Sequence, residues 1–277
     1  MKLTTIFIIA LCLFGSCAND SEKKNQISIM SFNIRYDEPN DGINNWIYRR
    51  QACVDMINDQ DPDVFGIQEG LIHQVNFMDS ALTAYTFVGE GRDSLMKNNE
   101  YSAVFFKNEK FVLLRAATFW LSATPEVASK GWDAKYNRIV TWVHLKDKRD
   151  GKELLVFNTH FDHRGEQARI ESAKLIALKA QEISGDTLMT FVVGDLNTLT
   201  ENDLLQPILT YMQSSQVMAP ITDSMGTTNS FKVAQEGKII DYVFYRHATP
   251  IQYQTIVKDY GVPYISDHYP VMAMFEY

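Results

Sequence analysis

Polar side chains stand at the ends of several apolar runs, where buried strands are expected to finish or begin. Asparagine, carboxylate and histidine residues of this kind are Asn33 after residues 29–32, Glu69 after 64–67, Asp195 and Asn197 after 190–193, and Asp267 and His268 before the last apolar run. Burying such groups costs several kcal/mol unless a cation or a hydrogen-bond network compensates. These residue types in these positions therefore favour a site for a metal ion and a phosphate group.

Three of these residues are candidate metal ligands. Asn33 and Glu69 each follow an expected strand and Asp267 precedes one, so all three could meet at one edge of the fold. Their oxygens are hard ligands, and the chain lacks a cysteine or paired-histidine ligand pattern, so Mg²⁺ or Mn²⁺ is favoured over structural zinc. Taken alone, Glu69 is equally well explained as an acid at a helix N-terminus.

Asp195, Leu196 and Asn197 could be mistaken for the start of a calcium-binding loop. The fifth and sixth positions are Leu199 and Thr200, where such a loop needs a ligand and a glycine, and the twelfth is not glutamate. After the run 190–193 the segment instead indicates a strand end whose side chains i and i+2 point the same way. The aspartate could take a proton from water while the amide contacts a phosphoryl oxygen; a turn-forming pair is the alternative.

Two histidines and one arginine complete the candidate phosphate site. His160 and His268 each have an acidic neighbour at the edge of an apolar run, and an imidazole can bind a phosphate oxygen or protonate a leaving group near neutral pH. Arg138 begins a strand-like run, and guanidinium binds phosphate through two parallel hydrogen bonds. A surface charge at a strand edge is the alternative for Arg138. His163 shares a loop with Arg164, and its role stays open.

The elements that position these residues are mostly strands. Runs rich in β-branched and aromatic residues predict strands at 27–33, 64–68, 85–89, 102–107, 111–120, 138–146, 153–159, 188–194, 239–246, 251–258 and 270–276. Helical patterns cover 46–58, 72–82 and 167–184, with a shorter one near 201–214. This pattern predicts an α/β fold in which two packed, mixed or antiparallel sheets are flanked by helices. No linker divides residues 27–277, so we expect one domain there.

The N-terminus has the pattern of an export signal. Lys2 is followed by an apolar stretch too short to span a bilayer, and small residues precede Cys17 as in the lipobox of bacterial lipoproteins. We therefore expect residues 1–16 to be removed, Cys17 to be lipidated, and 17–26 to tether the domain. The protein is then expected in the bacterial cell envelope, facing the periplasm or the cell surface. Cys53 remains as a buried small hydrophobe without a disulfide partner.

The charge balance disfavours nonspecific binding of nucleic acids. Removal of Lys2 with the signal leaves 25 basic and 34 acidic residues, a net charge of −9. Proteins that hold long polyanions usually present a basic surface, so this acidity favours a small substrate or a very local basic pocket.

The order of the motifs resembles the endonuclease/exonuclease/phosphatase superfamily. The segments that carry the resemblance cover essentially the whole mature domain and are 30–35, 66–69, 158–160, 194–197, 240–243 and 266–270. The resemblance implies a four-layer α/β sandwich with the site at one end. His160 departs from the pattern of abasic-site endonucleases, and residues 100–107 resemble the deadenylase-like branch. An exported protein would not meet cytoplasmic messenger RNA, so the substrate stays open.

The resemblance also implies a role for each site residue. Glu69, with Asn33 and Asp267, would hold the divalent ion, and Asp195 would deprotonate the attacking water while Asn197 positions the substrate. His268, oriented by Asp241, and His160, oriented by Glu100, would neutralise charge that develops on the phosphate. The expected phosphate-binding residues are Arg138, Arg164, Asn197 and His160.

These inferences predict an exported, lipid-anchored, Mg²⁺- or Mn²⁺-dependent phosphoesterase. It would hydrolyse a phosphodiester or phosphomonoester of a small molecule, lipid headgroup or nucleic acid by direct water attack, and no obligate protein partner is evident. A secreted nuclease acting on DNA or RNA is the first alternative. The second is a surface lipoprotein that binds a phosphate ligand without turnover, although binding alone would not require Asp195 together with both histidine pairs.

Overall fold

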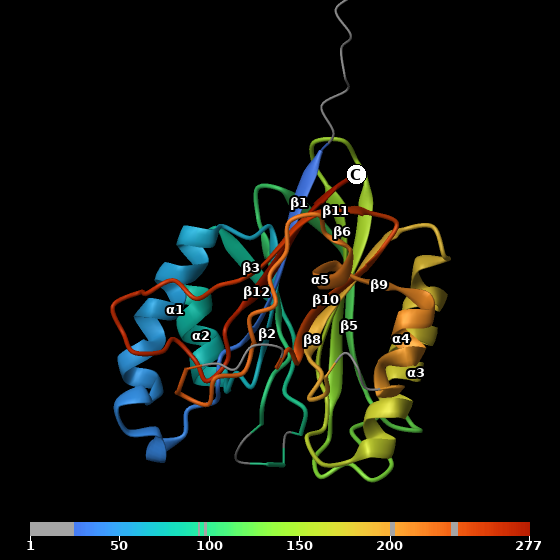
Figure 1. The fold of residues 1–277 in the computed structure, drawn as a ribbon. Helices are drawn as coiled ribbons and strands as arrows, with labels where there is room; N and C mark the ends of the chain where they lie inside the picture. Colours follow the sequence, from blue (N-terminus) through green and yellow to red (C-terminus); the bar gives the residue numbers. More distant parts are fainter. Residues whose placement is uncertain (1–24, 94, 97–98, 200–202, 234–237) are drawn as a thin grey trace, which may run out of the picture.

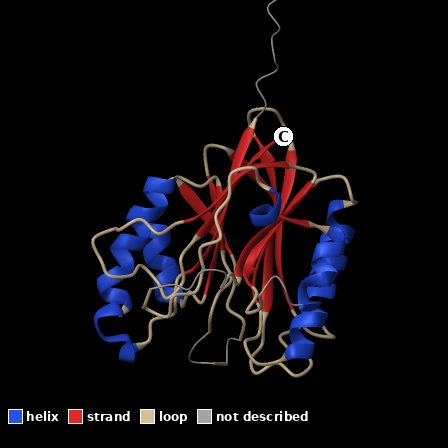
Figure 2. Cartoon of the chain, in the orientation of Figure 1, coloured by secondary structure: helices blue, strands red, loops and turns tan. Residues whose placement is uncertain are grey.

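Two mixed β-sheets pack face to face between two layers of helices (Figures 1 and 2). The computed structural model describes residues 25–93, 95–96, 99–199, 203–233 and 238–277. The predicted signal peptide, Cys17 and most of the predicted tether lie outside the described residues. In the part of the chain that is described, no helix is both long and apolar enough to cross a membrane.

Each sheet has six strands. The first has the order β11-β12-β1-β2-β4-β3, with β1 (Gln26–Asn33), β2 (Val64–Gln68), β3 (Tyr85–Val88), β4 (Val104–Lys107), β11 (Thr249–Thr255) and β12 (Val271–Glu276). The second has the order β5-β6-β7-β8-β10-β9, with β5 (Phe111–Trp120), β6 (Ile139–Asp147), β7 (Glu153–His160), β8 (Met189–Asp195), β9 (Gln213–Ser214) and β10 (Asp241–Arg246). In each sheet one central pair is parallel, β1 with β2 and β7 with β8, and the other pairs are antiparallel.

The helices cover the outer faces of the two sheets. Figure 1 shows α1 (Trp46–Gln60) and α2 (Ile72–Ala81) beside the first sheet, and α3 (Glu166–Ser184) and α4 (Gln206–Tyr211) beside the second. The remaining short helices are η1 (Pro39–Asn44), η2 (Asp203–Leu205) and α5 (Ser215–Met218). Buried apolar side chains form one cluster between the sheets and one beneath each helical layer. The predicted four-layer sandwich is confirmed.

The predicted elements agree with the structure to within a few residues, with one exception. The helix expected near 201–214 is shorter in the structure. The short helix η2 is followed by α4, which ends at Tyr211, and the chain then becomes extended in β9. Strand β9 pairs with β10, where Phe244 lies opposite Ser214. A two-residue strand carries too little periodicity to be recognised in sequence, so pairing with β10 overrides the local helical pattern there.

The two sheets approach closely where β2 crosses β7. The Asn158 amide group donates hydrogen bonds of 2.8 Å to the carbonyls of Ile67 and Ala103, and its oxygen accepts one of 2.6 Å from Gln68. A Cβ atom on Gly66 would lie 2.5 Å from the Asn158 side chain and 2.8 Å from that of Val193. Glycine at position 66 therefore permits the contact that ties the sheets together.

We predict that Gly66→Ala and Asn158→Ala interact energetically. Asn158→Ala leaves buried groups of the other sheet without partners and should lower the free energy of unfolding by about 3 kcal/mol. Gly66→Ala should cost about 1 to 3 kcal/mol through overpacking. The double variant should lose at least ~1 kcal/mol less than the sum, because shortening residue 158 makes room for the new methyl group. Urea denaturation of the four proteins measures this coupling.

The control combines Gly66→Ala with Asn108→Ala, in the turn after β4. Residues 66 and 108 share no hydrogen-bond partner, so these two costs should simply add. If the costs of Gly66→Ala and Asn158→Ala also simply add, the proposed packing of the sheets is contradicted.

Candidate functional site

The site lies where the ends of the central strands of both sheets meet. Because β1 and β2 run parallel, Asn33 lies opposite Gln68 and next to the turn that carries Glu69. In the second sheet β7 and β8 also run parallel, which sets His160 opposite Asp195. Strand β10 runs antiparallel to β8 and begins where β8 ends, so Asp241 lies opposite Asp195 as well. Strand direction thus collects the predicted polar strand ends within each sheet, and the packing of the two sheets brings both sets together.

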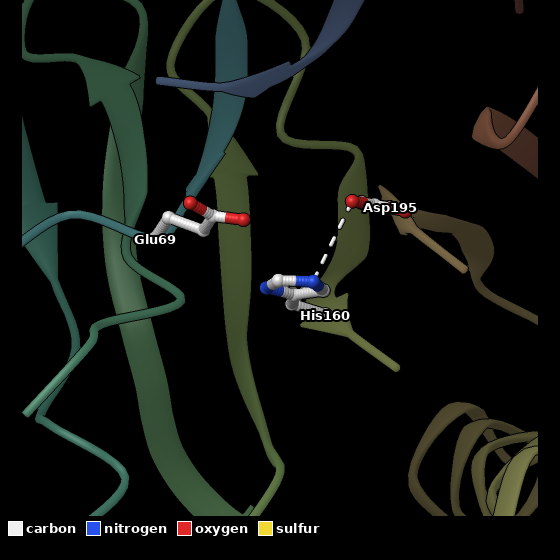
Figure 3. Close-up of side chains that lie close together, drawn as sticks. All are labelled: Glu69, His160 and Asp195. Atoms are coloured by element: carbon white, nitrogen blue, oxygen red, sulfur yellow. Dashed lines mark ion pairs between the residues drawn. The ribbon is translucent and has the colours of Figure 1, made fainter. Parts of the chain in front are cut away.

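The carboxylate of Asp195 is at the centre of the site. Its Oδ1 atom accepts a hydrogen bond of 2.9 Å from the backbone of Asn197, and its Oδ2 atom accepts one of 3.0 Å from the Asn33 amide. Nε2 of His160 lies 3.5 Å from the same Oδ2 atom, and Nε2 of His268 lies 3.8 Å from it. Figure 3 shows Asp195 and Glu69 on opposite sides of the His160 ring.

Three residues of the site have left-handed backbone conformations. Arg35, Glu69 and Asn197 have φ angles of 56°, 63° and 49°, and each follows closely on a strand that ends in the site. Residues other than glycine adopt this conformation at a cost, and such residues are enriched at functional sites. Here the conformation turns the chain sharply after the strand, and at Asn197 it directs the backbone N–H to Asp195.

The predicted metal ligands are neighbours, although they do not form one compact cluster. Asn33 donates to Oε1 of Glu69 at 3.2 Å, and the other oxygen of Glu69 accepts from the backbone of Tyr36 at 3.2 Å. Asp267 lies 3.8 Å from the guanidinium of Arg35. Among the described residues, two groups could offer ligand atoms within 4.8 Å of one another: Glu69 with His160 and Asp195, and Asp195 with Asp241 and His268. Asp267 belongs to neither group.

His268 is paired with Asp241 as the sequence predicts. Nδ1 of His268 lies 2.8 Å from Oδ2 of Asp241, and both side chains are buried. Burial by itself would lower the pKa of His268, but the carboxylates of Asp241 and Asp195 outweigh it and raise this pKa well above its usual value. The structure therefore favours an imidazolium at position 268 at neutral pH.

His160 differs from His268 in its partners. Its Nδ1 atom is buried without a hydrogen bond and lies 3.9 Å from Glu100, while Nε2 lies 3.0 Å from the Asn197 amide. Glu100 instead forms a two-pronged ion pair with Arg92 at 2.7 and 2.8 Å. Burial, together with the charges of Arg138 and Arg92, lowers the pKa of His160 well below its usual value. The expected pair of His160 and Glu100 is thus close in space but not hydrogen-bonded.

The carboxylates of the site repel one another. Burial and the charge of Asp241 raise the pKa of Asp195 to about 7, and burial with the charge of Glu69 raises that of Glu100 to about 7. Burial raises the pKa of Asp267 too, and Glu69 adds to this shift. Such a concentration of buried negative charge is what a bound cation would relieve.

A cavity of about 390 Å³ opens onto these groups, and we call it the site cavity. Its lining includes the predicted residues Glu69, Glu100, Arg138, His160, Asp195, Asn197 and His268. Asn33 and Asp241 are fully buried behind it. The structure does not bring Arg164 into this cavity: its side chain is exposed, and only its backbone contacts the neighbouring Asp162. Asp162 also accepts a hydrogen bond of 3.4 Å from Arg138 and so helps to hold that guanidinium in place.

Several residues of the site cavity were not expected from the sequence. Arg92, Lys135 and Tyr136 line it, together with Arg35, Tyr36 and His163. Arg92 is buried, and its guanidinium stacks over the Tyr136 ring at 4.8 Å. These side chains come from loops between strands, where neither periodicity nor a strand end marks them; the signal that was available was the arginine eight residues before Glu100.

We predict that Asp241→Asn lowers the pKa of His268 in the metal-free protein. The pKa of His268 is raised in the folded protein, so the pairing of its imidazolium with Asp241 adds to the free energy of unfolding. This stabilisation is fully present below about pH 6.5, the usual histidine pKa, and it is lost as the pH rises through the pKa of the folded state. Asp241→Asn should remove much of this stabilisation. NMR titration of the histidine ring signals, with unfolding measured across the same pH range, checks both effects.

Asp162→Asn is the matched control, because it alters a buried carboxylate beside Arg138 rather than beside His268. It should leave the His268 titration in place. A His268 pKa that does not move in Asp241→Asn would contradict the electrostatic role given to this pair.

Comparisons with known proteins agree with the fold. The model of the Endonuclease/Exonuclease/phosphatase family matches residues 30–268. A protein of this family from Bacteroides vulgatus is 35% identical, with 91% of this chain and 99% of that chain covered and a TM-score of 0.86. A mannosyl-6-phosphatase from Bacteroides thetaiotaomicron is 31% identical, with 91% and 100% covered and a TM-score of 0.85.

More distant matches include a human and a fungal protein. The human Nocturnin catalytic domain is 20% identical, with 91% of this chain and 96% of that chain covered and a TM-score of 0.71, which supports the fold alone. The Ccr4 exoribonuclease subunit of Emericella nidulans is 25% identical over 162 residues, which are 49% of this chain but only 24% of that protein. Because the family model spans most of the sequence and the Bacteroides proteins match nearly end to end, this chain belongs to the Endonuclease/Exonuclease/phosphatase family, whose members are divalent-metal-dependent hydrolases of phosphoester bonds.

Proposed function

We propose that the protein is an exported, Mg²⁺- or Mn²⁺-dependent phosphomonoesterase that releases inorganic phosphate from a sugar phosphate. The observation that carries this proposal is the composition of the site cavity, which is lined by Asp195 and His268 and also by the guanidinium groups of Arg92 and Arg138. Paired guanidinium groups suit a terminal phosphate, which carries two negative charges.

The residues present fit a divalent metal ion. Glu69, Asn33 and Asp267 offer hard oxygen donors, and Glu69 lies close enough to the other carboxylates to raise the pKa of Glu100 and of Asp267. The nitrogen of the Asn33 amide faces Glu69 and Asp195. Rotation of the amide by half a turn would place its oxygen at this position instead. A bound ion would polarise the phosphoryl group and stabilise the oxygen that leaves.

The side chains of the site suit direct attack by water. Asp195 would accept a proton from water as the new O–P bond forms, and the bond from phosphorus to the sugar oxygen would break. The proton that Asp195 takes up would then pass through solvent to the leaving oxygen, so that the products are the free sugar and inorganic phosphate and the carboxylate is regenerated. The His268 imidazolium and the Asn197 amide would donate hydrogen bonds to the phosphoryl oxygens as their charge grows.

The size and charge of the protein favour a small phosphomonoester. A cavity of about 390 Å³ is at the small end for ligand sites and suits one phosphorylated sugar unit. The chain has a formal net charge of −8, which disfavours a polynucleotide. The similarity to a mannosyl-6-phosphatase supports mannose 6-phosphate as the first substrate to try.

We predict metal-dependent release of phosphate from mannose 6-phosphate. With Mg²⁺ or Mn²⁺, its kcat/KM should exceed that of bis-p-nitrophenyl phosphate by at least about tenfold, a difference of roughly 1.4 kcal/mol. Chelation with EDTA should abolish turnover, and added metal should restore it. Asp195→Asn and His268→Ala should each lower kcat by at least ~100-fold, as expected when a group that acts in the transition state is removed.

Asp59→Asn, a surface carboxylate paired with Lys258, is the control for a generic loss of charge. The panel should include p-nitrophenyl phosphate, RNA, DNA, sphingomyelin and inositol phosphates. Faster turnover of RNA or DNA would replace the proposal with a nuclease. Tight metal and phosphate binding without turnover of any of these compounds would favour a binding protein.

The proposal of export depends on the first 17 residues. An apolar segment that precedes Cys17 supports lipidation of this cysteine and anchoring in the cell envelope. We predict that the full chain, expressed in a bacterium with a lipoprotein pathway, incorporates labelled fatty acid and sediments with membranes. Cys17→Ser should abolish both effects, whereas Cys12→Ser should change neither. Labelling of the Cys17→Ser protein would contradict this proposal.

A further inference from the structure

A second cavity, of about 590 Å³, adjoins the site cavity, and Tyr36 lines both. Its walls come from the loop after β1, the start of α2 and the segment before β4. The polar and aromatic residues of this lining are Tyr36, Asp37, Glu38, His73, Asn99 and Tyr101. We call this space the second cavity.

Tyr36 connects the second cavity to the catalytic groups. Its backbone N–H donates to Glu69 in the site cavity at 3.2 Å, and its hydroxyl donates to Glu38 in the second cavity at 3.0 Å. A ligand whose phosphate lies near Glu69 therefore reaches the second cavity by passing Tyr36. The second cavity is in position to receive what is attached to the phosphate.

The walls of the second cavity are held in place by buried contacts. The fully buried side chain of Gln74 accepts hydrogen bonds from the backbones of Asp37 and Leu71 at 3.0 and 3.1 Å, and it donates one to the Arg35 carbonyl at 3.0 Å. Nε2 of His73 lies 2.9 Å from Oδ2 of Asp37. A ligand would thus meet a preformed site and lose little binding energy to ordering of the walls.

The two cavities differ in charge. The site cavity is lined by the cations Arg35, Arg92, Lys135 and Arg138 together with the carboxylates Glu69, Glu100 and Asp195. The described lining of the second cavity holds no lysine or arginine and presents Asp37 and Glu38. Carboxylates at this position repel the further phosphates of a nucleic acid but accept hydrogen bonds from hydroxyl groups. The tyrosines add apolar surface with a polar end, which suits the mixed C–H and O–H surface of a sugar ring.

We propose that the second cavity binds the neutral saccharide that carries the phosphate, so that the substrate is a phosphorylated oligosaccharide and not a nucleic acid. This inference rests on the proposed phosphomonoesterase function and adds to it a set of specificity residues. Asp37 and Glu38 select a neutral leaving group, and Tyr36 and Tyr101 bind the sugar ring beside it.

The test compares substrates that do and do not reach the second cavity. The kcat/KM values are measured for p-nitrophenyl phosphate, mannose 6-phosphate, a mannobiose phosphorylated at O6, and a dinucleotide with a terminal phosphate. We expect the phosphorylated disaccharide to be preferred over p-nitrophenyl phosphate by at least about tenfold, and the dinucleotide to be the poorest substrate. The Ki of unphosphorylated mannobiose, as a competitor of p-nitrophenyl phosphate, gives a second measure that needs no turnover of a sugar phosphate.

Variants of the second cavity should change this ranking. Asp37→Asn with Glu38→Gln should raise the kcat/KM of the dinucleotide relative to the disaccharide by about tenfold, as expected when like charges beside the ligand are removed. Tyr101→Ala should raise the Ki of mannobiose. His247→Ala is the matched control, because it removes a surface imidazole that lies beside Asp186, far along the chain from this cavity.

The outcomes separate this inference from the proposed function. Suppose that phosphomonoesters are hydrolysed, but the wild type and the Asp37 and Glu38 variants rank the substrates in the same order. This result would overturn the second cavity as a specificity site, while the phosphomonoesterase proposal stands. No turnover of any phosphomonoester would overturn both. A melting temperature equal to that of the wild type shows that each variant is folded.

Discussion

The close approach of the two sheets at Asn158 determines the geometry of the site. Asn33 and Glu69 come from the first sheet, whereas His160, Asp195 and Asp241 come from the second. The hydrogen bond from Asn33 to Asp195, at 3.0 Å, therefore joins the two sheets. Gly66 provides the space, and the three hydrogen bonds of Asn158 keep the sheets at this distance. Catalytic geometry and sheet packing thus depend on the same few contacts, which places the polar groups on the most rigid part of the fold.

The cost of this arrangement is electrostatic. Burial raises the pKa of Asp195, Glu100 and Asp267, and each carboxylate increases the repulsion on its neighbours. The fold offsets part of this charge with its own cations: His268 lies between Asp241 and Asp195, and Arg92 holds both oxygens of Glu100. The charge that these cations leave uncompensated lies around Glu69. This carboxylate accepts hydrogen bonds from the Asn33 amide and from the backbone N–H of Tyr36, and among the described residues it forms no ion pair with a lysine or arginine. A divalent ion there would complete the charge balance that the side chains begin.

Much of the fold and of the central site could be predicted from the sequence, because both follow from where strands end. Asn33, His160, Asp195 and Asp241 are each the first or last residue of a strand. Strand pairing brings the last three together within the second sheet, and the packing of the two sheets adds Asn33. Residues on loops lack such a constraint. Arg92 reaches the site because its loop closes back on Glu100, and Arg164 misses it because Asp162 takes its backbone N–H and leaves its side chain exposed. Glu100 was expected to pair with His160, but it binds Arg92 in the structure. The arginine lies on a loop near Glu100 and offers two charged hydrogen bonds, whereas a neutral histidine offers at most one.

The net charge of the chain disfavours a long polyanion but does not describe the ligand site, where the charge of the lining varies over a short distance. The chain is acidic overall, yet arginines and a lysine lie beside the carboxylates of the site cavity, whereas the described lining of the second cavity holds carboxylates without lysine or arginine. Under the proposed function, a phosphate and a neutral polar group would meet different environments within one ligand site. Under the proposed function, Asp195, His268 and Glu69 would act at the bond that is broken, and they would then carry no information about the rest of the substrate. Selectivity must then come from groups that touch the leaving group, and the loop after β1 is well suited to it: Arg35 faces the phosphate side, and Asp37 and Glu38, two and three residues later, face the other cavity. A change of two or three residues in this loop would alter the substrate without disturbing the strand ends that perform the reaction.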